Sequence, residues 1–575
     1  MSIHQEWILA EPVDHADSVP VRSAVVRSIL ARRGVRDADA FRLFTSPTVE
    51  DLHDGSLIDG MDVACKRIEL AISDSEAILI YGDYDVDGVT SIVLLKTVLK
   101  KLGAKVGFVV PHRIYDGYGL RTEVIERVLA EKQVGLIITV DCGITSVEPV
   151  RLAIEKGIDV IITDHHLPPD DLPLAAAVLN PKKEGCVYPF DDLAGVGVAF
   201  KLCAELIRRA GSSLSLESLI KIAAIGTIAD VAPLIDENRT IARLGLLGLA
   251  DSSNPGLRAL LKVLGLHGTP LLAEDVGFKI GPRINAAGRI ASADTAIELF
   301  DAADESTAYD IAFELNRLNQ KRKSIETTVL TDAREMITDG HLPNVLFLRK
   351  EGWHKGVLGL CAGRIAEQFH RPTLLATIEN GLCTGSARSI AAIDLHARLD
   401  RLNRYFLSFG GHEFACGFSL KVADVLDFAR DLPDVFGEIP ERSFVRTLRV
   451  EEEVTFDQIT PDLVDELGLL EPLGQGNPEP RFLLRDVAIR GIREFSEGCY
   501  SVTLEGSTGG AEAILWPSVG GLLSVLNETV RVDLVVSIGR DRFTRDKARL
   551  TIIDAAGSDQ SPVRNESTSP SVLDG

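Results

Sequence analysis

Residues 77–88 read AILIYGDYDVDG. A short apolar run passes through one glycine into three aspartates at alternate positions, Asp83, Asp85 and Asp87. Such a run is typical of a strand buried on both faces of a parallel sheet. In open α/β sheets, ligands bind beyond the carboxyl ends of the strands. The segment therefore predicts a functional edge at which carboxylates collect.

The same pattern recurs as far as residue 180. Each apolar run is followed by a polar or Gly-rich turn and then by an amphipathic helical stretch, which indicates an α/β fold with a parallel sheet. We expect strands at residues 77–81, 106–110, 135–140, 158–163 and 177–179, and a helical region at about 196–264.

Two more of these strands end in residue types that bind metals. Asp141 follows one strand, and Asp164, His165 and His166 follow another, while Asp230 follows a separate apolar segment. Turn or helix-capping roles explain any one of these aspartates alone. They do not explain four segments that end alike, so metal binding is the favoured interpretation. An EF-hand is excluded, because no glutamate stands at the twelfth position of the loop.

The ligand types indicate which ion is bound. Carboxylate oxygen and imidazole nitrogen without thiolate suit Mn²⁺, with Mg²⁺ as the alternative. At least five carboxylates crowd together here, and their repulsion favours two divalent ions over one. Two ions about 3.5–4 Å apart activate water and stabilise a phosphoryl displacement. The expected reaction is hydrolysis of a phosphate ester.

Composition limits the remaining choices. A chain of 575 residues suggests several domains, and 45% apolar residues allow a large core. The net charge of −23 argues against coating nucleic acid by bulk electrostatics, so any nucleic acid should be met locally by Arg and Lys. The eight cysteines lie far apart without a Cys-x-x-Cys pair, which suggests buried reduced thiols. No signal peptide or apolar run of membrane-spanning length is evident, so we expect a cytoplasmic protein that has no membrane partner.

Six regions follow from the pattern along the chain. Residues 305–340 contain one long charged helix without Pro or Gly, and mixed α/β patterning returns after it. Short alternating runs then predict a small β-barrel, for which an OB-fold is the best match. The regions are an N-terminal extension (1–45), a catalytic α/β domain (46–304), the connecting helix (305–340), a second α/β domain (341–440), the barrel (441–556) and a disordered tail (557–575).

These segments resemble known motifs. The aspartates at 83–87, Asp141, the triplet 164–166 and Asp230 in GTIADVAPL look like the four motifs of DHH phosphoesterases. The stretches RINAAGRI (283–290), GWHKGVLGLCAGRI (352–365), GSARSI (385–390), FGGHEFACGFSL (409–420) and EPLGQGNPEPRF (471–482) are similar to segments of the RecJ family. The resemblance covers nearly the whole chain. It implies a DHH domain, a DHHA1 domain and an OB-fold in that order.

The resemblance also implies an activity. Its members are single-stranded-DNA-specific 5′-to-3′ exonucleases, which release 5′-mononucleotides by two-metal-ion catalysis in DNA repair and recombination. The partners implied are single-stranded DNA, single-strand-binding protein and a RecQ-type helicase. Two alternatives stay open: a DHH phosphodiesterase acting on short oligonucleotides or cyclic dinucleotides, and a non-catalytic replication scaffold. The scaffold is the less favoured, because every motif carboxylate and both histidines are present.

Roles in the metal site are implied in the same way. Asp85 and Asp87 would hold one ion each, Asp141 would bridge, and His165 and Asp230 would complete the second ion's shell. Asp83 and Asp164 would support that shell, and His166 would contact the scissile phosphate. The family's pyrophosphatase branch has a histidine where this chain has Tyr81, so the first ion's coordination stays open and a pyrophosphatase is disfavoured.

Candidate nucleic-acid residues lie in other segments. Gly410, Gly411 and His412 form an expected turn that would bring backbone amides to a phosphate, or would simply be a tight turn. Ser386 and Arg388, on a turn opened by Gly385, are 5′-phosphate candidates together with Arg113, and Arg283, Asn285 and Arg289 would line the strand's path. An ion-pair role stays open for each arginine. In the barrel, Phe482, Tyr500 and Trp516 would stack on bases or, more simply, pack in the core.

Overall fold

The computed structural model describes residues 5–14, 18–117, 119–337, 342–529, 531–540 and 548–566. Its contacts divide the chain into two units. Unit A comprises residues 42–323 and 471–478, and unit B comprises residues 1–41, 324–470 and 479–575. The division falls inside α14 (Glu305–Met336), the long helix that the sequence predicts.

Unit A is built on a parallel sheet with the strand order β3-β2-β4-β5-β6. Every neighbouring pair runs parallel, as the repeated strand–helix pattern predicts. The strands are β2 (Ala77–Gly82), β3 (Lys105–Val109), β4 (Leu136–Val140), β5 (Asp159–Thr163) and β6 (Ala177–Leu179). Each boundary lies within one residue of its predicted position, because continuous apolar runs bounded by turns leave little ambiguity.

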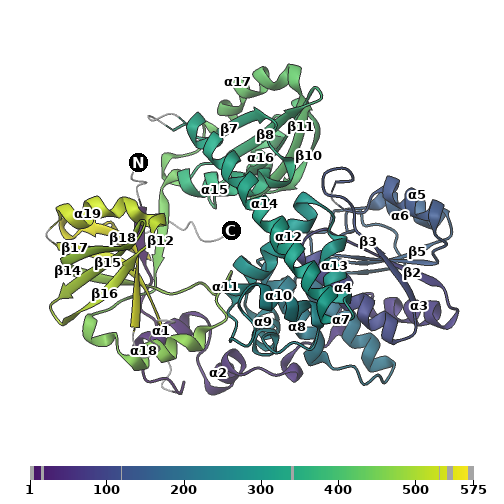
Figure 1. The fold of residues 1–575 in the computed structure, drawn as a ribbon, viewed down its shortest axis with the longest axis horizontal. Coiled ribbons are helices and arrows are strands. Elements are labelled where there is room, and N and C mark those ends of the chain that lie inside the picture. The colour runs from purple at the N-terminus through teal and green to yellow at the C-terminus, as the bar shows by residue number, and fades with distance from the viewer. Residues whose placement is uncertain are drawn as a thin grey trace. The chain divides into compact units, whose positions relative to one another are not determined.

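Helices cover both faces of this sheet (Figure 1). Ile78 and Ile80 of β2 face the core formed with α3, α4 and α7, whereas Leu79 and Tyr81 face the core formed with α5 and α6. The helices are α3 (Met61–Ser73), α4 (Val86–Lys101), α5 (Thr122–Glu131), α6 (Val147–Glu155), α7 (Gly195–Arg209), α8 (Leu216–Ala229), α9 (Asp236–Leu249), α10 (Pro255–Val263), α11 (Ala273–Asp275), α12 (Gly281–Ile290) and α13 (Asp294–Asp301). This is the two-sided covering that buried parallel strands require.

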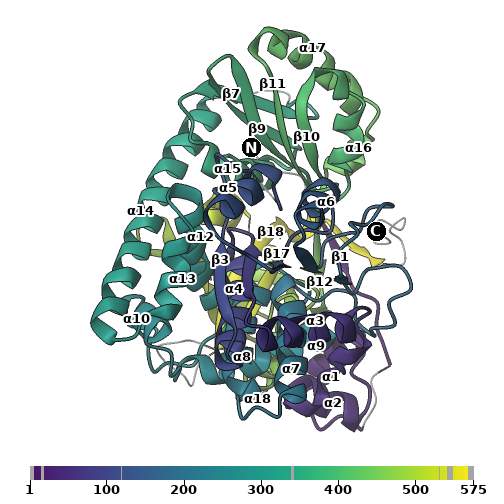
Figure 2. The same cartoon turned by 90° about the vertical axis from the view of Figure 1, so that its right-hand side faces the viewer.

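Unit B contains a second sheet with the order β10-β11-β9-β8-β7. Only β7 and β8 run parallel. The elements are β7 (Leu346–Glu351), β8 (Thr373–Glu379), β9 (Leu382–Arg388), β10 (Phe406–His412) and β11 (Ala415–Lys421), with α15 (Lys355–Phe369), α16 (Leu395–Asp400) and α17 (Val425–Phe436). Helix α15 packs on β8 and β9, and α16 and α17 close the opposite face (Figure 2).

Two predicted turns in this sheet are wrong. Gly385, Ser386 and Arg388 lie within β9, and Gly410 to His412 lie within β10. A Cβ on Gly385 would lie 2.4 Å from the Phe418 ring and 2.6 Å from a backbone oxygen. This glycine therefore allows close packing within the sheet, where the sequence suggested a change of direction.

The C-terminal region forms the predicted barrel. Strands β14, β15, β16, β18 and β17 pair in that order, and β17 pairs again with β14 to close the ring. The barrel strands are β14 (Arg481–Ser496), β15 (Cys499–Gly506), β16 (Gly509–Leu515), β17 (Arg531–Arg540) and β18 (Ala548–Gly557). Around them lie β12 (Arg446–Val450), β13 (Glu452–Glu453), α18 (Pro461–Leu467) and α19 (Leu523–Glu528).

The two ends of the described chain meet in a small sheet. Strand β1 (Gln5–Leu9) pairs in parallel with both β12 and β19 (Val563–Asn565). Trp7 in β1 is fully buried, and its Nε1 donates to Asp554 Oδ2 at 2.7 Å. The prediction of disorder from residue 557 is therefore wrong as far as residue 566, because Val563 supplies an apolar contact that composition alone hides. Residues 567–575 of that predicted tail lie outside the described residues.

The remaining N-terminal helices are α1 (Ala24–Arg32) and α2 (Ala38–Thr45). All eight cysteines are free thiols, as expected, but the prediction that all are buried is wrong for Cys186 and Cys499, which are only partly buried. Over the described ranges, no helix combines the length and the apolar character needed to cross a membrane.

Candidate metal centre

Three adjacent strands deliver carboxylates to the same edge of the unit A sheet. Asp83 follows β2, Asp141 follows β4 and Asp164 follows β5. All three are buried, with at most 3% of each residue exposed. The convergence predicted from the strand ends is present in the structure.

Two helix N-termini organise the carboxylates that follow β2. Asp85 is the N-cap of α4, and its side chain accepts the N–H groups of Asp87 at 3.0 Å and Gly88 at 3.1 Å. The buried Asp87 carboxylate accepts the N–H groups of Gly195 and Val196, both at 2.7 Å, at the start of α7. Unpaired N–H groups at helix N-termini favour negative charge, so both carboxylates are held in place before any ion binds.

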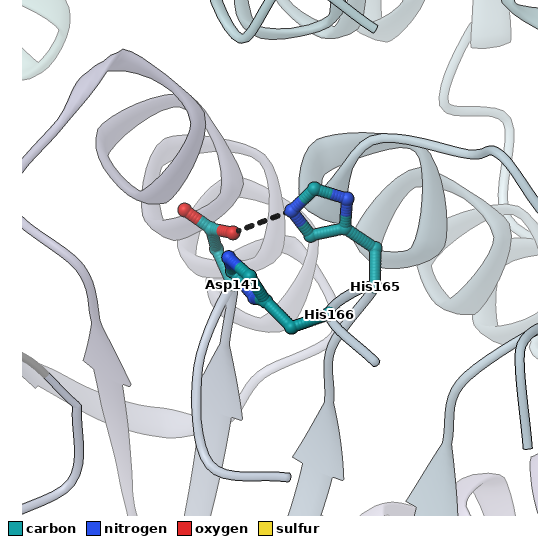
Figure 3. Close-up of side chains that lie close together, drawn as sticks. All are labelled: Asp141, His165 and His166. Carbon is teal, nitrogen blue, oxygen red and sulfur yellow. Dashed lines mark ion pairs between the residues drawn. The ribbon is translucent and has the colours of Figure 1, made fainter. Parts of the chain in front are cut away.

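His165 lies among three carboxylates. Its Nε2 is 3.2 Å from Oδ1 of Asp141, 3.8 Å from Oδ2 of Asp230 and 3.9 Å from Oδ2 of Asp87. Figure 3 shows His165 and His166 turned toward Asp141 from the neighbouring strand end. Four predicted ligands, which come from four separate segments, thus surround one point.

Asp164 organises the turn that contains both histidines. Its Oδ1 accepts the backbone N–H groups of His165 at 2.8 Å and His166 at 3.1 Å, and its Oδ2 accepts the N–H of Ile144 at 2.9 Å. Asn180, which the sequence analysis missed, donates from Nδ2 to the His166 carbonyl at 2.8 Å. The available sequence signal was the position of Asn180 directly after an apolar strand. A side-chain amide that is buried there must find hydrogen-bond partners.

Burial and mutual repulsion disturb the titration of this cluster. Burial, followed by the charge of neighbouring aspartates, raises the pKa of Asp83, Asp141 and Asp230 well above the usual range. Burial and then Asp85 raise the pKa of Asp87 to about 7. Burial and then His166 lower the pKa of His165 to about 3, which keeps its imidazole neutral and able to bind a metal. Like charges this close call for a cation.

The donor atoms fit two divalent ions. Three groups have ligand atoms within 4.8 Å of one another: Asp83, Asp85 and Asp141; Asp87, His165 and Asp230; and Asp141, His165 and His166. Within the described ranges, Asp83 Oδ1 and His165 Nε2 are buried without a hydrogen-bond partner. Such atoms are costly unless something else binds them. Because Asp141 occurs in two of the groups, it is the best-placed residue to be shared.

One glycine keeps the centre compact. A Cβ on Gly226 would lie 2.3 Å from Thr90 Oγ1, 2.7 Å from a Val196 methyl group and 3.1 Å from Asp87 Oδ1. Helix α8 can therefore approach the site only with glycine at this position.

Of the candidate DNA-contact residues in unit A, two touch the β2–α4 loop. Arg113 stacks on Tyr84, with Cζ 4.4 Å from the ring centre, and the Asn285 side chain accepts the N–H of Val86 at 3.2 Å. Arg283 donates to the Lys279 carbonyl at 3.0 Å and to Asn316 at 3.3 Å. Arg289 lies on α12 with Asn285 and Arg283.

Four of the five candidates in unit B share one face of their sheet, whereas Gly411 falls at the alternate position with Cys416 and Ala387. In the central strand β11, Gly417 stands between Ser386 of β9 and Gly410 of β10. Ala415 of β11 stands in the same way between Arg388 of β9 and His412 of β10. Residues directly opposite one another in antiparallel strands lie on the same face. The Arg388 guanidinium donates to Ser386 Oγ at 3.0 Å. A Cβ on Gly410 or Gly417 would meet no atom within 4 Å, so small residues leave an open floor beside Arg388.

Comparisons with known proteins agree with this arrangement. The chain matches the DHH family, N-terminal domain over residues 77–227, the DHHA1 domain over 342–435 and the RecJ OB domain over 450–554. It is 37% identical to the single-stranded-DNA-specific exonuclease RecJ of Bacillus subtilis (strain 168), over 93% of this chain and 68% of that protein. It is 33% identical to the protein of the same name from Escherichia coli (strain K12), over 94% and 97%. The chain belongs to the RecJ family.

A solved RecJ structure has the same fold. The RecJ–Mn²⁺ complex from Thermus thermophilus aligns with a TM-score of 0.83 at 29% identity, covering 96% of this chain and 80% of that one. A RecJ–Mg²⁺ complex from the same source aligns with a TM-score of 0.77 at 27% identity, covering 96% of this chain and 78% of that one. These two ions are the ones that the donor set of this RecJ-family chain favours.

Tyr81 and the barrel aromatics have clear positions in this RecJ-family chain. The Tyr81 hydroxyl donates to the Gly119 carbonyl at 3.0 Å on the α5 side of the sheet, so Tyr81 belongs to the core. Phe482 is fully buried in the barrel, in agreement with the core-packing alternative. Tyr500 is partly buried, and Trp516 is 39% exposed. Only the last two retain surface for base stacking.

Proposed function

We propose that this chain hydrolyses single-stranded DNA from its 5′ end and releases 5′-mononucleotides, with two divalent ions as cofactors and Mn²⁺ preferred over Mg²⁺. The buried cluster of carboxylates around His165 is the observation that supports it, together with the names of the relatives. Degradation of single strands in this way would serve DNA repair and recombination. The domain division expected from the sequence is part of the proposal.

The chemistry follows from the residues around the cluster. Two divalent ions supply stabilisation of negative charge on phosphate oxygens and lower the pKa of water. Asp85 and Asp87 would hold one ion each, Asp141 would bridge, and His165 and Asp230 would complete the second ion's shell. Asp83 would support that shell, and within the described ranges its buried Oδ1 has no hydrogen-bond partner. Asp164 would fix the orientation of His166, whose Nδ1 it contacts at 2.7 Å, so that Nε2 contacts the scissile phosphate.

Recognition of the DNA would use the other candidates. In unit B, Ser386 and Arg388 would bind the 5′-phosphate, and the open floor at Gly410 would accept the end of the DNA beside Gly411 and His412. In unit A, Arg113 is a further candidate for phosphate binding. Arg283, Asn285 and Arg289 would line the path of the strand. A guanidinium binds a terminal phosphate through two parallel hydrogen bonds, which suits this task.

A nuclease assay tests the function. The substrate is 3′-labelled, 5′-phosphorylated single-stranded DNA with Mn²⁺, compared with its duplex and with Asp141→Ala. We expect stepwise loss from the 5′ end of the single strand only, abolished by the substitution. Cleavage of dinucleotides alone would replace the proposal with a small-substrate phosphodiesterase, and no cleavage at all would favour the scaffold.

The proposal also includes two protein partners. By family resemblance we propose a single-strand-binding protein and a RecQ-type helicase, which would supply single-stranded substrate. Co-purification from a mixture of the isolated proteins, with and without DNA, tests each partner separately.

A further inference from the structure

A short segment between α18 and the barrel belongs to unit A, although the chain on both sides of it belongs to unit B. This segment, residues 471–478, reads EPLGQGNP and is called the strap below. Asn477 stiffens it: its buried side chain donates to the Pro472 carbonyl at 2.7 Å, and its backbone pairs with Gly474 in both directions. The strap thus has a fixed shape of its own.

The strap is bound to the residues that directly follow Asp230. The Leu234 N–H donates to the Gln475 carbonyl at 2.7 Å. A Cβ on Gly474 would lie 2.7 Å from Leu234 Cδ1, and one on Gly476 would lie 3.1 Å from Ile235 and 3.2 Å from Pro233. Both glycines are needed for this close approach, and Gly476 also has a φ of 71°.

Arg239 of α9 binds the first two residues of the strap. It is 4% exposed, and it donates to the carbonyls of Glu471 at 2.6 Å, Pro472 at 3.2 Å and Phe44 at 3.1 Å. Its guanidinium also stacks on the Phe44 ring at 3.5 Å. A buried guanidinium with this many acceptors is hard to replace, because lysine cannot reproduce the planar fork.

The backbone between Asp230 and the strap contacts is strained. Val231 has a φ of 62°, a left-handed conformation that is unfavourable for a β-branched residue, and its side chain is 65% exposed. Because the Val231 side chain is largely exposed, packing of that side chain does not hold the left-handed backbone. Such strain persists only where surrounding structure enforces it. At the end of α8 the Ala232 N–H donates to the Thr227 carbonyl at 3.3 Å, and just beyond it the strap contacts residues 233–235.

We propose that the strap positions Asp230 for metal binding and that Arg239 is a positioning residue of the metal centre. This inference rests on the proposed role of Asp230 as a ligand. The end of α8 holds the Val231 turn from one side, and the strap holds it from the other through residues 233–235. The turn in its place sets where the Asp230 carboxylate points. Outer contacts that orient a ligand typically change metal affinity by about 10- to 100-fold.

Direct Mn²⁺ binding to the full-length protein without DNA tests this inference. Titration calorimetry, or the electron paramagnetic resonance signal of free Mn²⁺, counts the bound ions and gives their affinities. Two variants disturb the strap independently: Arg239→Met removes the fork, and Gly476→Ala pushes the strap away from Pro233 and Ile235. We expect each to weaken one of the two ions by about 10- to 100-fold and to leave the other near the wild-type affinity.

Arg67→Met is the matched control. Arg67 is also a largely buried arginine of unit A, with bonds to Glu76 at 2.7 Å, Asp159 at 2.6 Å and the Gly135 carbonyl at 3.2 Å. These partners lie at the amino ends of the strands, away from the metal edge. We expect Arg67→Met to lower thermal stability without changing either Mn²⁺ affinity.

The outcomes distinguish failure of the strap inference from failure of the metal site. If the wild type binds two ions and both strap variants bind them with unchanged affinity, the strap inference is wrong and the metal site stands. If the wild type binds no Mn²⁺, the proposed metal site itself fails. If Arg67→Met weakens one ion as much as Arg239→Met does, the effect is general destabilisation and the inference is again wrong.

Discussion

The Asp164 carboxylate lies 2.7 Å from Nδ1 of His166 and also accepts the backbone N–H of that residue at 3.1 Å. One carboxylate therefore fixes both the ring and the backbone that presents it. Although burial acts against it, the hydrogen bond from His166 lowers the pKa of Asp164, so the carboxylate stays ionised. Asp164 thus serves to hold a neighbour in position.

Asp164→Ala should lower kcat on single-stranded DNA by about 10- to 100-fold, the usual effect of losing a residue that orients a ligand or catalytic group. Asp164→Asn keeps an acceptor for the backbone N–H groups and should lose less. Steady-state assays at saturating Mn²⁺ measure both variants. Wild-type kcat in the alanine variant would contradict the assigned role.

Gly226→Ala should destabilise unit A by about 1–3 kcal/mol, because the added methyl group overlaps Thr90 and Val196 in a filled core. It should also weaken Mn²⁺ binding, since Asp87 lies 3.1 Å from the new atom. Denaturant unfolding and a Mn²⁺ titration measure the two effects. Gly107→Ala in β3 is the control: its Cβ meets nothing within 4 Å, and the change should stay within about 0.5 kcal/mol.

Arg388→Lys should reduce the preference for a 5′-phosphate over a 5′-hydroxyl end by about 10-fold in kcat/KM. A lysine keeps the positive charge but loses the paired hydrogen bonds. The comparison uses two single strands that differ only at that end. Arg398→Lys, whose guanidinium bonds Glu438 at 3.3 Å, should leave the preference unchanged. An equal effect of both substitutions would remove Arg388 from the proposed phosphate site.

Asp554 predicts a pH dependence of stability. Burial raises its pKa, although the hydrogen bond from Trp7 acts the other way. The folded state therefore favours the protonated carboxyl: the stability that this provides is complete below the unfolded pKa of about 4 and is lost as pH rises through the folded pKa. Relative to Asp554→Asn, the wild type should lose unfolding free energy as the pH rises above about 4. Denaturant unfolding of both proteins across this range measures the difference, and a constant difference would refute the assignment.

Some features could be predicted because local chemistry determines them. The strand ending at Val140 is a bounded apolar run, and its carboxyl end must lie beside that of the strand ending at Thr163 in a parallel sheet. Asp141 and Asp164 then share an edge whatever the loops do. The division of Asp83, Asp85 and Asp87 among different partners could not be foreseen, because it depends on how α7 approaches α4.

Other features depend on distant contacts. Gly385 and Gly410 suggested turns because glycine is common in turns, yet both lie within strands. Packing against Phe418 leaves no room for a side chain at Gly385, whereas Gly410 lies beside open space. The strap's attachment to Leu234 joins residues about 240 positions apart, and no local pattern indicates it. Asn180 likewise has a role only because the turn at His166 brings the His166 carbonyl within reach of the Asn180 amide.

The small sheet at the chain ends has a consequence for synthesis. Trp7 pairs with Val563, so the first described strand finds one of its two neighbours only in the last. At typical rates of 5–20 residues per second, about half a minute to two minutes separates their emergence from the ribosome. During that interval β1 lacks at least one of its two neighbouring strands, β12 or β19, and Trp7 is not yet fully buried. Sequence changes near Val563 would prolong the exposure of this edge to aggregation and to chaperones.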